Sequence, residues 1–255
     1  MNQTGIFISY DEWWNRMRRI NEGQPNLLYI EKQDPWSSHS IIQKWLNRFP
    51  PGTKVLDIGT ATGLLGKRCE GFGFLLKGIE PVQKWAEEAK PYYDKILCTS
   101  LEQAPDEFLS TQDVVILADV LEHTSSPEKI LTHLVALQKP GTQIFISIPN
   151  VANIWIRVNL LFGKFNYADN GILDRTHLRF FTKFTFLELL HSSGLNIVEL
   201  RFTPIPLNRV TPFFQNNPSG RFIHRALNFF ARMLPELFAY QFVARTELTH
   251  KEQES

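Results

Sequence analysis

The sequence predicts a doubly wound α/β fold, in which a seven-stranded, mostly parallel, Rossmann-like sheet carries helices on both faces and an antiparallel last strand. From about residue 53, short apolar runs alternate with amphipathic stretches, which is typical of parallel strands joined by helices. The run from Asp113 to Ala118 is almost purely aliphatic, as expected for a central strand covered on both faces. The 255 residues, 43% hydrophobic and 21% charged, suffice for one large domain with insertions.

The elements are expected in a regular order. The expected strands span residues 53–58, 74–79, 95–98, 113–118, 143–148, 195–202 and 238–246. The expected helices between them span residues 63–70, 82–90, 127–137 and 184–191. Two long segments, 150–182 and 203–235, break this alternation, and we expect them to be insertions that cap one edge of the sheet. Residues 1–52 are aromatic-rich and are expected to form a helical cap before the main domain, residues 53–255.

Composition and charge exclude several classes of protein. A formal net charge of +1 provides no basic field, so no nucleic-acid partner is expected. The two cysteines, Cys69 and Cys98, are too few for a disulfide framework and lack metal-ligand spacing. No stretch reaches the roughly 18 uninterrupted apolar residues of a membrane span, and the first residues lack the apolar core of a signal peptide. We therefore expect a cytoplasmic protein.

The most informative motif is the loop of small residues that leaves the first strand, Asp-Ile-Gly-Thr-Ala-Thr-Gly over residues 57–63. A loop of this kind between a strand and a helix places a ligand at the carboxyl end of the sheet. Gly59 permits the turn, and Gly63 permits the backbone to approach the ligand closely. A dinucleotide fingerprint would need glycine where Ala61 and Leu64 stand, and a phosphate-binding P-loop would need lysine after Gly63. Both nucleotide-phosphate interpretations fail.

The loop resembles motif I of the class I S-adenosylmethionine-dependent methyltransferases, a strand that ends Asp-x-Gly-x-Gly-x-Gly. Asp57, Gly59 and Gly63 match this motif, whereas Ala61 stands at its usual middle glycine. The resemblance implies that S-adenosyl-L-methionine is the cofactor. It also implies that the loop, Thr60 included, surrounds the methionine part of that cofactor.

The second strand ends in an acid. Glu80, followed by Pro81, lies roughly 20 residues beyond the glycine loop, where a ribose-binding carboxylate is expected in folds of this type. A carboxylate at this position can accept hydrogen bonds from both ribose hydroxyls. Glu80 and Pro81 are therefore assigned to the cofactor site.

The ends of the third and fourth strands complete the expected cofactor site. By the family resemblance, Ser100 and Leu101 contact the adenine, although the family prefers an acid where Ser100 stands. Asp119 and Val120 follow the fourth strand and are expected to border the cofactor. All four residues lie at the carboxyl edge of the predicted sheet.

The second half of the chain carries the resemblance that bears on the methyl acceptor. The Leu-Glu-His triplet at 121–123 resembles the ubiquinone-biosynthesis O-methyltransferases, and the runs at 160–165 and 171–182 resemble methyltransferases of bacterial glycan-assembly clusters. These resemblances imply O-methylation of a glycan or lipid-linked glycan precursor, with a polyprenyl quinone phenol as the alternative. A non-catalytic partner protein on the same fold stays open, because Ala61 and Ser100 depart from the family at cofactor positions.

Transfer of a methyl group to a hydroxyl oxygen benefits from a general base, which contributes about 10²–10⁴-fold to the rate. The candidates are His123 and His177, with Asp119 near the cofactor. The alternative for His123 is a capping or packing role. The alternative for His177 is a network of Asp174 with Arg175 or Arg179 that only stabilises the loop.

A divalent metal site is a further alternative at the same place. Carboxylates and an imidazole from Asp119, Glu122 and His123 converge over about one helical turn, and such ligands suit divalent metals. The sequence leaves open whether a metal binds.

Each long insertion contains a basic amphipathic stretch. Residues 154–165 place Ile154, Val158 and Leu161 on one helical face, with Arg157 and Lys164 opposite. Residues 222–238 show the same pattern, with apolar side chains at 222, 226, 229, 230 and 233 and arginines at 221, 225 and 232 on another face. Such helices can lie in a membrane interface, here the inner face of the membrane, where a lipid-linked acceptor would be found. The alternatives are packing of the apolar face on the sheet or across a homodimer.

Overall fold

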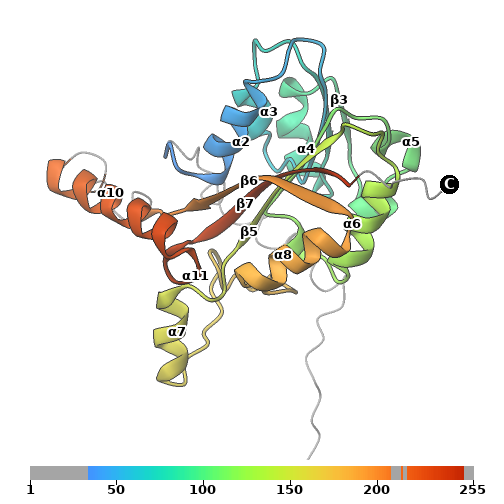
Figure 1. The fold of residues 1–255 in the computed structure, drawn as a ribbon. Helices are drawn as coiled ribbons and strands as arrows, with labels where there is room; N and C mark the ends of the chain where they lie inside the picture. Colours follow the sequence, from blue (N-terminus) through green and yellow to red (C-terminus); the bar gives the residue numbers. More distant parts are fainter. Residues whose placement is uncertain (1–33, 208–213, 215–216, 250–255) are drawn as a thin grey trace, which may run out of the picture. The chain divides into compact units, whose positions relative to one another are not determined.

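A seven-stranded sheet with the order β3-β2-β1-β4-β5-β7-β6 forms the centre of the fold (Figure 1). The strands are β1 (Lys54–Ile58), β2 (Leu75–Ile79), β3 (Lys95–Leu97), β4 (Val114–Ala118), β5 (Gln143–Pro149), β6 (Leu195–Thr203) and β7 (Gln241–Leu248). Strands β1 to β5 pair in parallel, and β7 runs antiparallel to both of its neighbours, β5 and β6. The predicted mostly parallel sheet with an antiparallel last strand is confirmed.

The structure is a computed structural model that describes residues 34–207, 214 and 217–249. All of these residues belong to one of the two contact units of the chain, residues 32–255. Residues 1–33 of the expected helical cap therefore lie outside the described residues. Its described part contains one helix, α2 (Ser38–Leu46), whose Trp45 is buried against the sheet.

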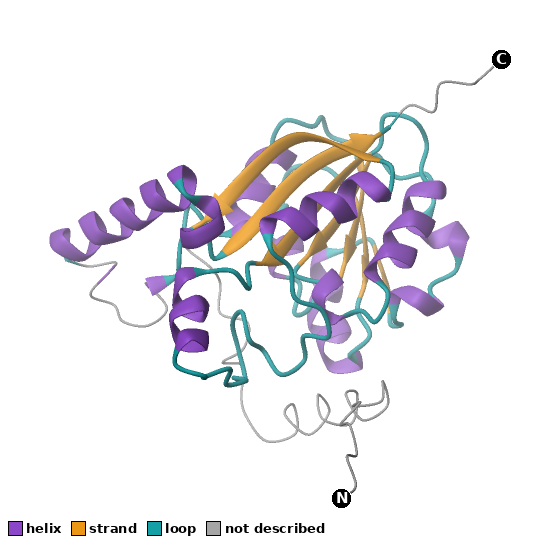
Figure 2. Ribbon diagram, turned by 60° about the horizontal axis from the view of Figure 1, so that its bottom comes forward, coloured by secondary structure: helices purple, strands orange, loops and turns teal. Residues whose placement is uncertain are grey.

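Helices cover both faces of the sheet (Figure 2). The other α-helices of the described residues are α3 (Leu64–Arg68), α4 (Gln83–Ala89), α5 (Asp106–Leu109), α6 (Pro127–Ala136), α7 (Ile154–Leu161), α8 (Lys183–Ser192), α10 (Pro218–Met233) and α11 (Pro235–Phe238). Helices α2 and α3 share one apolar cluster with Val114 and Ile116 of β4, and α5, α6 and α8 share the other with Val115 and Leu117. Successive strand residues point to opposite faces, which explains why β4 is aliphatic throughout.

The main difference from the predicted elements lies near the end of the chain. The helix expected over 222–238 is two helices, because α10 ends at Met233 and the short α11 follows it from Pro235. A proline has no backbone N–H to continue the ladder of the preceding helix. The last strand consequently begins at Gln241 rather than at residue 238.

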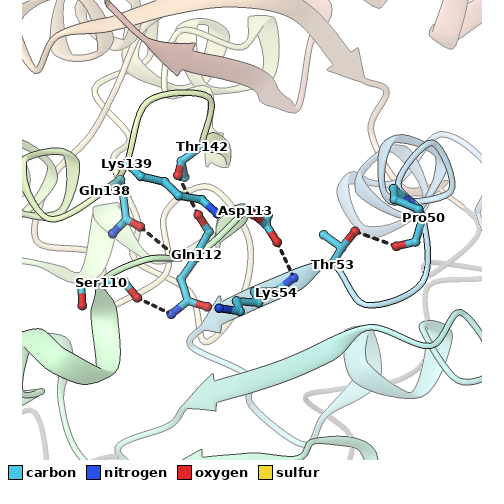
Figure 3. A network of polar contacts seen from close by, with 9 residues as sticks. All are labelled: Pro50, Thr53, Lys54, Ser110, Gln112, Asp113, Gln138, Lys139 and Thr142. Atoms are coloured by element: carbon cyan, nitrogen blue, oxygen red, sulfur yellow. Dashed lines mark hydrogen bonds and ion pairs between the residues drawn. The ribbon is translucent and has the colours of Figure 1, made fainter.

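Polar contacts close the amino edge of the sheet (Figure 3). The Asp113 carboxylate accepts a hydrogen bond from the backbone N–H of Lys54 at 2.8 Å and one from Lys139 Nζ at 2.6 Å. The buried Thr142 hydroxyl donates to the Gln112 carbonyl at 2.7 Å. These contacts join the starts of β1, β4 and β5. In open α/β folds ligands bind at the opposite, carboxyl edge of the sheet.

Gly63 is required by packing as well as by backbone conformation. Its φ of +82° lies in the left-handed region, and a Cβ at this position would lie 2.8 Å from Cα of Ala89 at the end of α4. We expected Gly63 to bring the backbone close to a ligand, and the close approach that it makes in the structure is to α4. Gly63 therefore sets the distance between α4 and the start of α3.

We expect Gly63→Ala to lower the free energy of unfolding by about 2–5 kcal/mol, from left-handed strain and a backbone clash together. Gly141→Ala is the matched control, because Gly141 has a φ of +87° and nothing within 4 Å of an added Cβ. The control should lose only the strain, about 1–2 kcal/mol. Urea denaturation of both variants measures the difference, and equal losses would contradict the packing role.

Candidate functional site at the carboxyl edge of the sheet

The glycine loop after β1 lies between the end of β2 and the residues that follow β4. The backbone N–H groups of Gly59 and Thr60 both donate to the Ile79 carbonyl, at 2.8 and 3.1 Å. Gly59 has a φ of +75°, and a Cβ there would lie 2.8 Å from Cγ2 of Val120. A side chain at position 59 would therefore be strained and would force Val120, which lies directly beside the turn, to shift.

Ala61 occupies a backbone conformation that normally favours glycine. Its φ is +47°, a region that costs an L-residue about 1–2 kcal/mol. Its N–H donates to Glu80 Oε2 at 2.8 Å, and the N–H of Val82 donates to Glu80 Oε1 at 2.9 Å. One carboxylate thus holds the strained residue and the start of the segment after β2. Each oxygen keeps a further lone pair for a ligand hydroxyl.

Burial controls the ionisation of two carboxyl groups near this loop. Desolvation raises the pKa of Glu80 from 4.5 to about 7, against the hydrogen bonds from Val82 and Ala61. Desolvation likewise raises the pKa of Asp57 from 3.8 to about 7, against its hydrogen bond from Tyr93. At neutral pH both carboxyl groups are therefore close to the midpoint of their titration.

Asp57, which we assigned to the cofactor site, hydrogen-bonds to Tyr93 on the side of the loop that faces α3. The Tyr93 hydroxyl donates to Asp57 Oδ2 at 2.5 Å and accepts from the backbone N–H of Gly66 at 3.1 Å. The pair links β1 to α3. Tyr93 was missed in the sequence, because nothing in its neighbourhood marks it as the partner of a residue 36 positions away.

The ends of β2 and β3 lie next to each other on the adenine side of the expected site. The Glu80 N–H donates to the Leu97 carbonyl at 3.1 Å, which holds the two strand ends together. Ser100 is buried, and a 3₁₀ turn begins at Leu101, whose side chain packs against the core. Pro81 is half-buried and faces Cys98, whose Sγ lies 3.9 Å from the Pro81 carbonyl oxygen.

Asp119 also has a strained backbone, with a φ of +60°. Its carboxylate accepts hydrogen bonds from the Ser147 hydroxyl at 2.7 Å and from Gln241 Nε2 at 2.8 Å to each oxygen. The N–H of Gln241 in turn donates to the Thr203 hydroxyl at 3.0 Å. Three further strands therefore fix this carboxylate. Sequence reasoning missed Gln241, which only the antiparallel pairing of β7 brings to this place.

His123 and His177 lie together although 54 positions separate them. Their rings are edge-to-face with centroids 4.7 Å apart. His123 lies in a 3₁₀ turn over Leu121–His123, ahead of α6, which begins at Pro127. His123 Nδ1 lies 3.2 Å from the Thr176 carbonyl oxygen, and His177 Nδ1 lies 3.0 Å from the Ile172 carbonyl oxygen. A carbonyl at Nδ1 selects the tautomer that leaves a lone pair on Nε2.

The segment that carries His177 is fixed to the turn that carries His123. The N–H groups of Leu178 and Arg179 donate to the Glu122 carbonyl at 2.8 and 3.0 Å. Asp174 accepts from the Thr176 hydroxyl at 2.6 Å, and that hydroxyl lies 3.1 Å from His123 Nδ1. The expected partners of Asp174, Arg175 and Arg179, are engaged elsewhere: Arg175 pairs with Asp169, and Arg179 donates to the Ser125 carbonyl. Asp174 instead holds Thr176, which orients His123.

The electrostatic surroundings keep both imidazoles uncharged at neutral pH. Burial, and secondarily the neighbouring His177, lowers the pKa of His123 from 6.5 to about 4. Burial also lowers the pKa of His177, against the opposing charge of Asp174. Asp119 acts on both rings in the direction that favours protonation.

Among the described residues, the set that converges as metal ligands differs from the one expected. Ligand atoms of Glu122, His123 and His177 all lie within 4.8 Å of one another. His177 replaces Asp119 in this set, because hydrogen bonds from β5 and β7 hold the Asp119 carboxylate. One buried carboxylate with two imidazoles is a donor set that divalent first-row metals accept. The cluster can therefore serve either as a pair of proton acceptors or as a metal site.

Comparison with known proteins shows the family to which the chain belongs. The family model described as a methyltransferase domain matches residues 33–200. The chain belongs to this methyltransferase-domain family, within the class I S-adenosylmethionine-dependent superfamily.

The curated relatives include ubiquinone biosynthesis O-methyltransferases. The mitochondrial protein of Homo sapiens is 28% identical over 157 residues, covering 57% of this chain and 42% of its own. The protein of Coxiella burnetii is 25% identical over 201 residues, covering 74% and 79%. The match thus spans less than half of the human relative and about four fifths of the bacterial one.

A solved structure shows the same fold. The magnesium protoporphyrin IX methyltransferase of Synechocystis, solved with bound S-adenosylhomocysteine, superposes with a TM-score of 0.59 and 17% sequence identity. The superposition covers 92% of this chain and 94% of that chain. The seven-stranded arrangement is therefore that of a cofactor-binding methyltransferase fold.

The raised pKa of Asp57 has a consequence for stability. Between about pH 4 and 7 the folded state keeps a proton that the unfolded chain releases, so the carboxyl group makes the protein less stable as the pH rises. Relative to Asp57→Asn, the wild type should lose about 1.4 kcal/mol of unfolding free energy per pH unit in this window. Urea denaturation at several pH values checks this. The lowered pKa of His123 acts in the opposite direction, but it contributes to both proteins and drops out of the difference between their unfolding free energies. A difference that stays constant with pH would refute the raised pKa of Asp57.

Removal of the Glu80 carboxylate should weaken binding of S-adenosylmethionine. We expect Glu80→Ala to cost about 1–3 kcal/mol of binding free energy, because the ribose hydroxyls would lose their hydrogen-bond acceptor. Calorimetric titration measures this, with Glu87→Ala as the control, because Glu87 is an exposed carboxylate on α4 paired with Lys90. Unchanged affinity in Glu80→Ala would remove Glu80 from the cofactor site.

Proposed function

We propose that this chain transfers a methyl group from S-adenosylmethionine to a hydroxyl oxygen of a glycan or lipid-linked glycan precursor. The observation that carries the proposal is the His123–His177 pair, which lies beyond β4 on the same edge of the sheet as the glycine loop. A pair of uncharged imidazoles with fixed tautomers suits an acceptor that must lose a proton. Hydroxyl groups are acceptors of this kind.

The cofactor site would be formed by the three neighbouring strand ends. The loop from Gly59 to Gly63 would surround the methionine part, and Glu80 would accept hydrogen bonds from the ribose hydroxyls with the lone pairs that Ala61 and Val82 leave available. Ser100 and Leu101 would border the adenine. When bound, S-adenosylmethionine supplies an electrophilic methyl group on its sulfonium.

The histidine pair would act on the acceptor. One imidazole Nε2 accepts the hydroxyl proton while the acceptor oxygen forms its bond to the methyl carbon and the carbon–sulfur bond breaks. The fixed negative charge of Asp119 stabilises the imidazolium that results, since it favours protonation of both His123 and His177. Ser147 and Gln241 keep that charge in place.

A polyprenyl quinone phenol is the second candidate acceptor. The names of the human and Coxiella relatives favour it, and a phenol loses its proton more readily than a sugar hydroxyl. The two acceptors separate in one assay, in which the labelled methyl group is followed into glycan-containing and quinone-containing extracts. Label in the quinone fraction alone would replace the glycan proposal.

We expect His123→Gln and His177→Gln to lower the rate of methyl transfer by about 10²–10⁴-fold, the usual contribution of a general base. Binding of S-adenosylmethionine should stay unchanged, because neither histidine is assigned to the cofactor site. His133→Gln is the matched control: it is an exposed histidine on α6 that pairs with Asp106. Transfer of labelled methyl groups to the extracts gives the rates, and calorimetry gives the affinity.

The same variants separate the base from the metal interpretation. Activity that survives a strong chelator supports proton acceptance by the imidazoles alone. Activity that chelation removes and Mn²⁺ restores in the wild type, but not in Glu122→Gln, would assign Glu122, His123 and His177 to a bound metal instead.

A further inference from the structure

Helix α10 buries its polar side and exposes its apolar side, the reverse of an ordinary surface helix. Its buried positions follow the helical period and include two polar side chains, His224 and Asn228. Its large apolar side chains point outward: Phe222 is 72% exposed, and Phe229 and Met233 are exposed as well. The sequence left open that the apolar stripe packs on the sheet. In the structure that stripe is exposed, and the side of the helix with His224 and Asn228 is buried instead.

Specific contacts hold the polar side of α10 against the protein. His224 Nε2 lies 3.3 Å from Asp34 Oδ2, and the His224 ring contacts Trp36 edge-on with centroids 5.0 Å apart. The helix also packs against β6 and α11. The outward orientation of Phe222 and Phe229 is therefore fixed by the contacts of the opposite side.

Helix α7 lies at the same end of the sheet as α10 (Figures 1 and 2). It presents a second exposed apolar surface. Leu161 is 81% exposed and Trp155 67%, and Phe162 directly after the helix is exposed too. The side chain of Asn153, the N-cap of α7, donates to the carbonyl of Ala239 at 2.9 Å. Ala239 directly follows α11, the neighbour of α10 in sequence and in space. Both long insertions thus contribute to the same end of the sheet.

The charges on these helices have one sign. Neither α7 nor α10 contains an aspartate or a glutamate. The exposed cations beside the apolar residues are Arg157, Lys164, Arg221, Arg225 and Arg232. We call these five cations, together with the exposed apolar side chains of α7 and α10 and Phe162, the basic aromatic face.

We propose that the basic aromatic face docks on the surface of an anionic lipid bilayer. Aromatic and aliphatic side chains enter the headgroup boundary, and arginine and lysine are attracted to lipid phosphates. None of the described helices has the length and apolarity to cross a bilayer, so the contact lies in the interface. A symmetric dimer through this face would place the five cations against the same five cations, which disfavours a second copy as the partner. The inference goes beyond methyl transfer and does not depend on the acceptor.

Sedimentation of the full chain with lipid vesicles tests the proposal without any enzymatic readout. We expect binding to vesicles with about 30% phosphatidylglycerol to be at least about ten-fold tighter than binding to pure phosphatidylcholine, because several cations face the lipid. Arg225→Glu with Arg232→Glu should abolish this preference. Phe222→Ser with Phe229→Ser should reduce binding to the anionic vesicles by about ten-fold or more.

Two controls make the result specific to the face. Leu75→Ser removes a half-exposed apolar side chain at the start of β2, and Lys84→Glu reverses an exposed charge on α4. Both should bind vesicles like the wild type, and circular dichroism should confirm that every variant is folded. Equal binding of all variants, or no binding to anionic vesicles, overturns the proposal. A homodimer in light scattering that the phenylalanine variants dissociate would overturn it in favour of a second copy.

Discussion

The strained turn after β1 is the constraint on which the rest of the site depends. Gly59, Ala61 and Gly63 all have positive φ angles, and only two of them are glycines. The third is held because Glu80 accepts the N–H groups of Ala61 and Val82 with its two oxygens. Glu80 therefore couples the conformation of the turn to the position of the end of β2. Because Glu80 lies beside the turn, its carboxylate is also within reach of a ligand that the turn would surround.

The carboxyl edge combines parts that the chain supplies far apart. The turn after β4 supplies His123, whereas His177 arrives on the insertion after β5 and is oriented by contacts to that same turn. Asp119 depends in the same way on β5 and β7. The insertions are therefore not additions to a finished domain, because the first of them delivers a histidine and both contribute to the basic aromatic face.

Local patterns predicted the strands, most helices and the glycine loop, because each of these depends on neighbours within a few residues. The aliphatic run of β4 and the small residues at 59–63 are examples. The partners Tyr93 and Gln241 were not predictable, since they meet Asp57 and Asp119 only through contacts across 36 and 122 positions. The orientation of α10 escaped prediction for another reason: its sequence contains an apolar stripe and a polar stripe with His224, and only tertiary contacts decide which is buried.

The antiparallel insertion of β7 between β5 and β6 bears on how the protein matures during translation. The ribosome releases the segment with Asp119 well before residue 241 exists, so that carboxylate must wait for the last strand to obtain its amide donor. The Asp119 carboxylate therefore reaches its final set of hydrogen bonds only when β7 has joined the sheet. Closure of the sheet by its final strand is thus also the event that finishes the site.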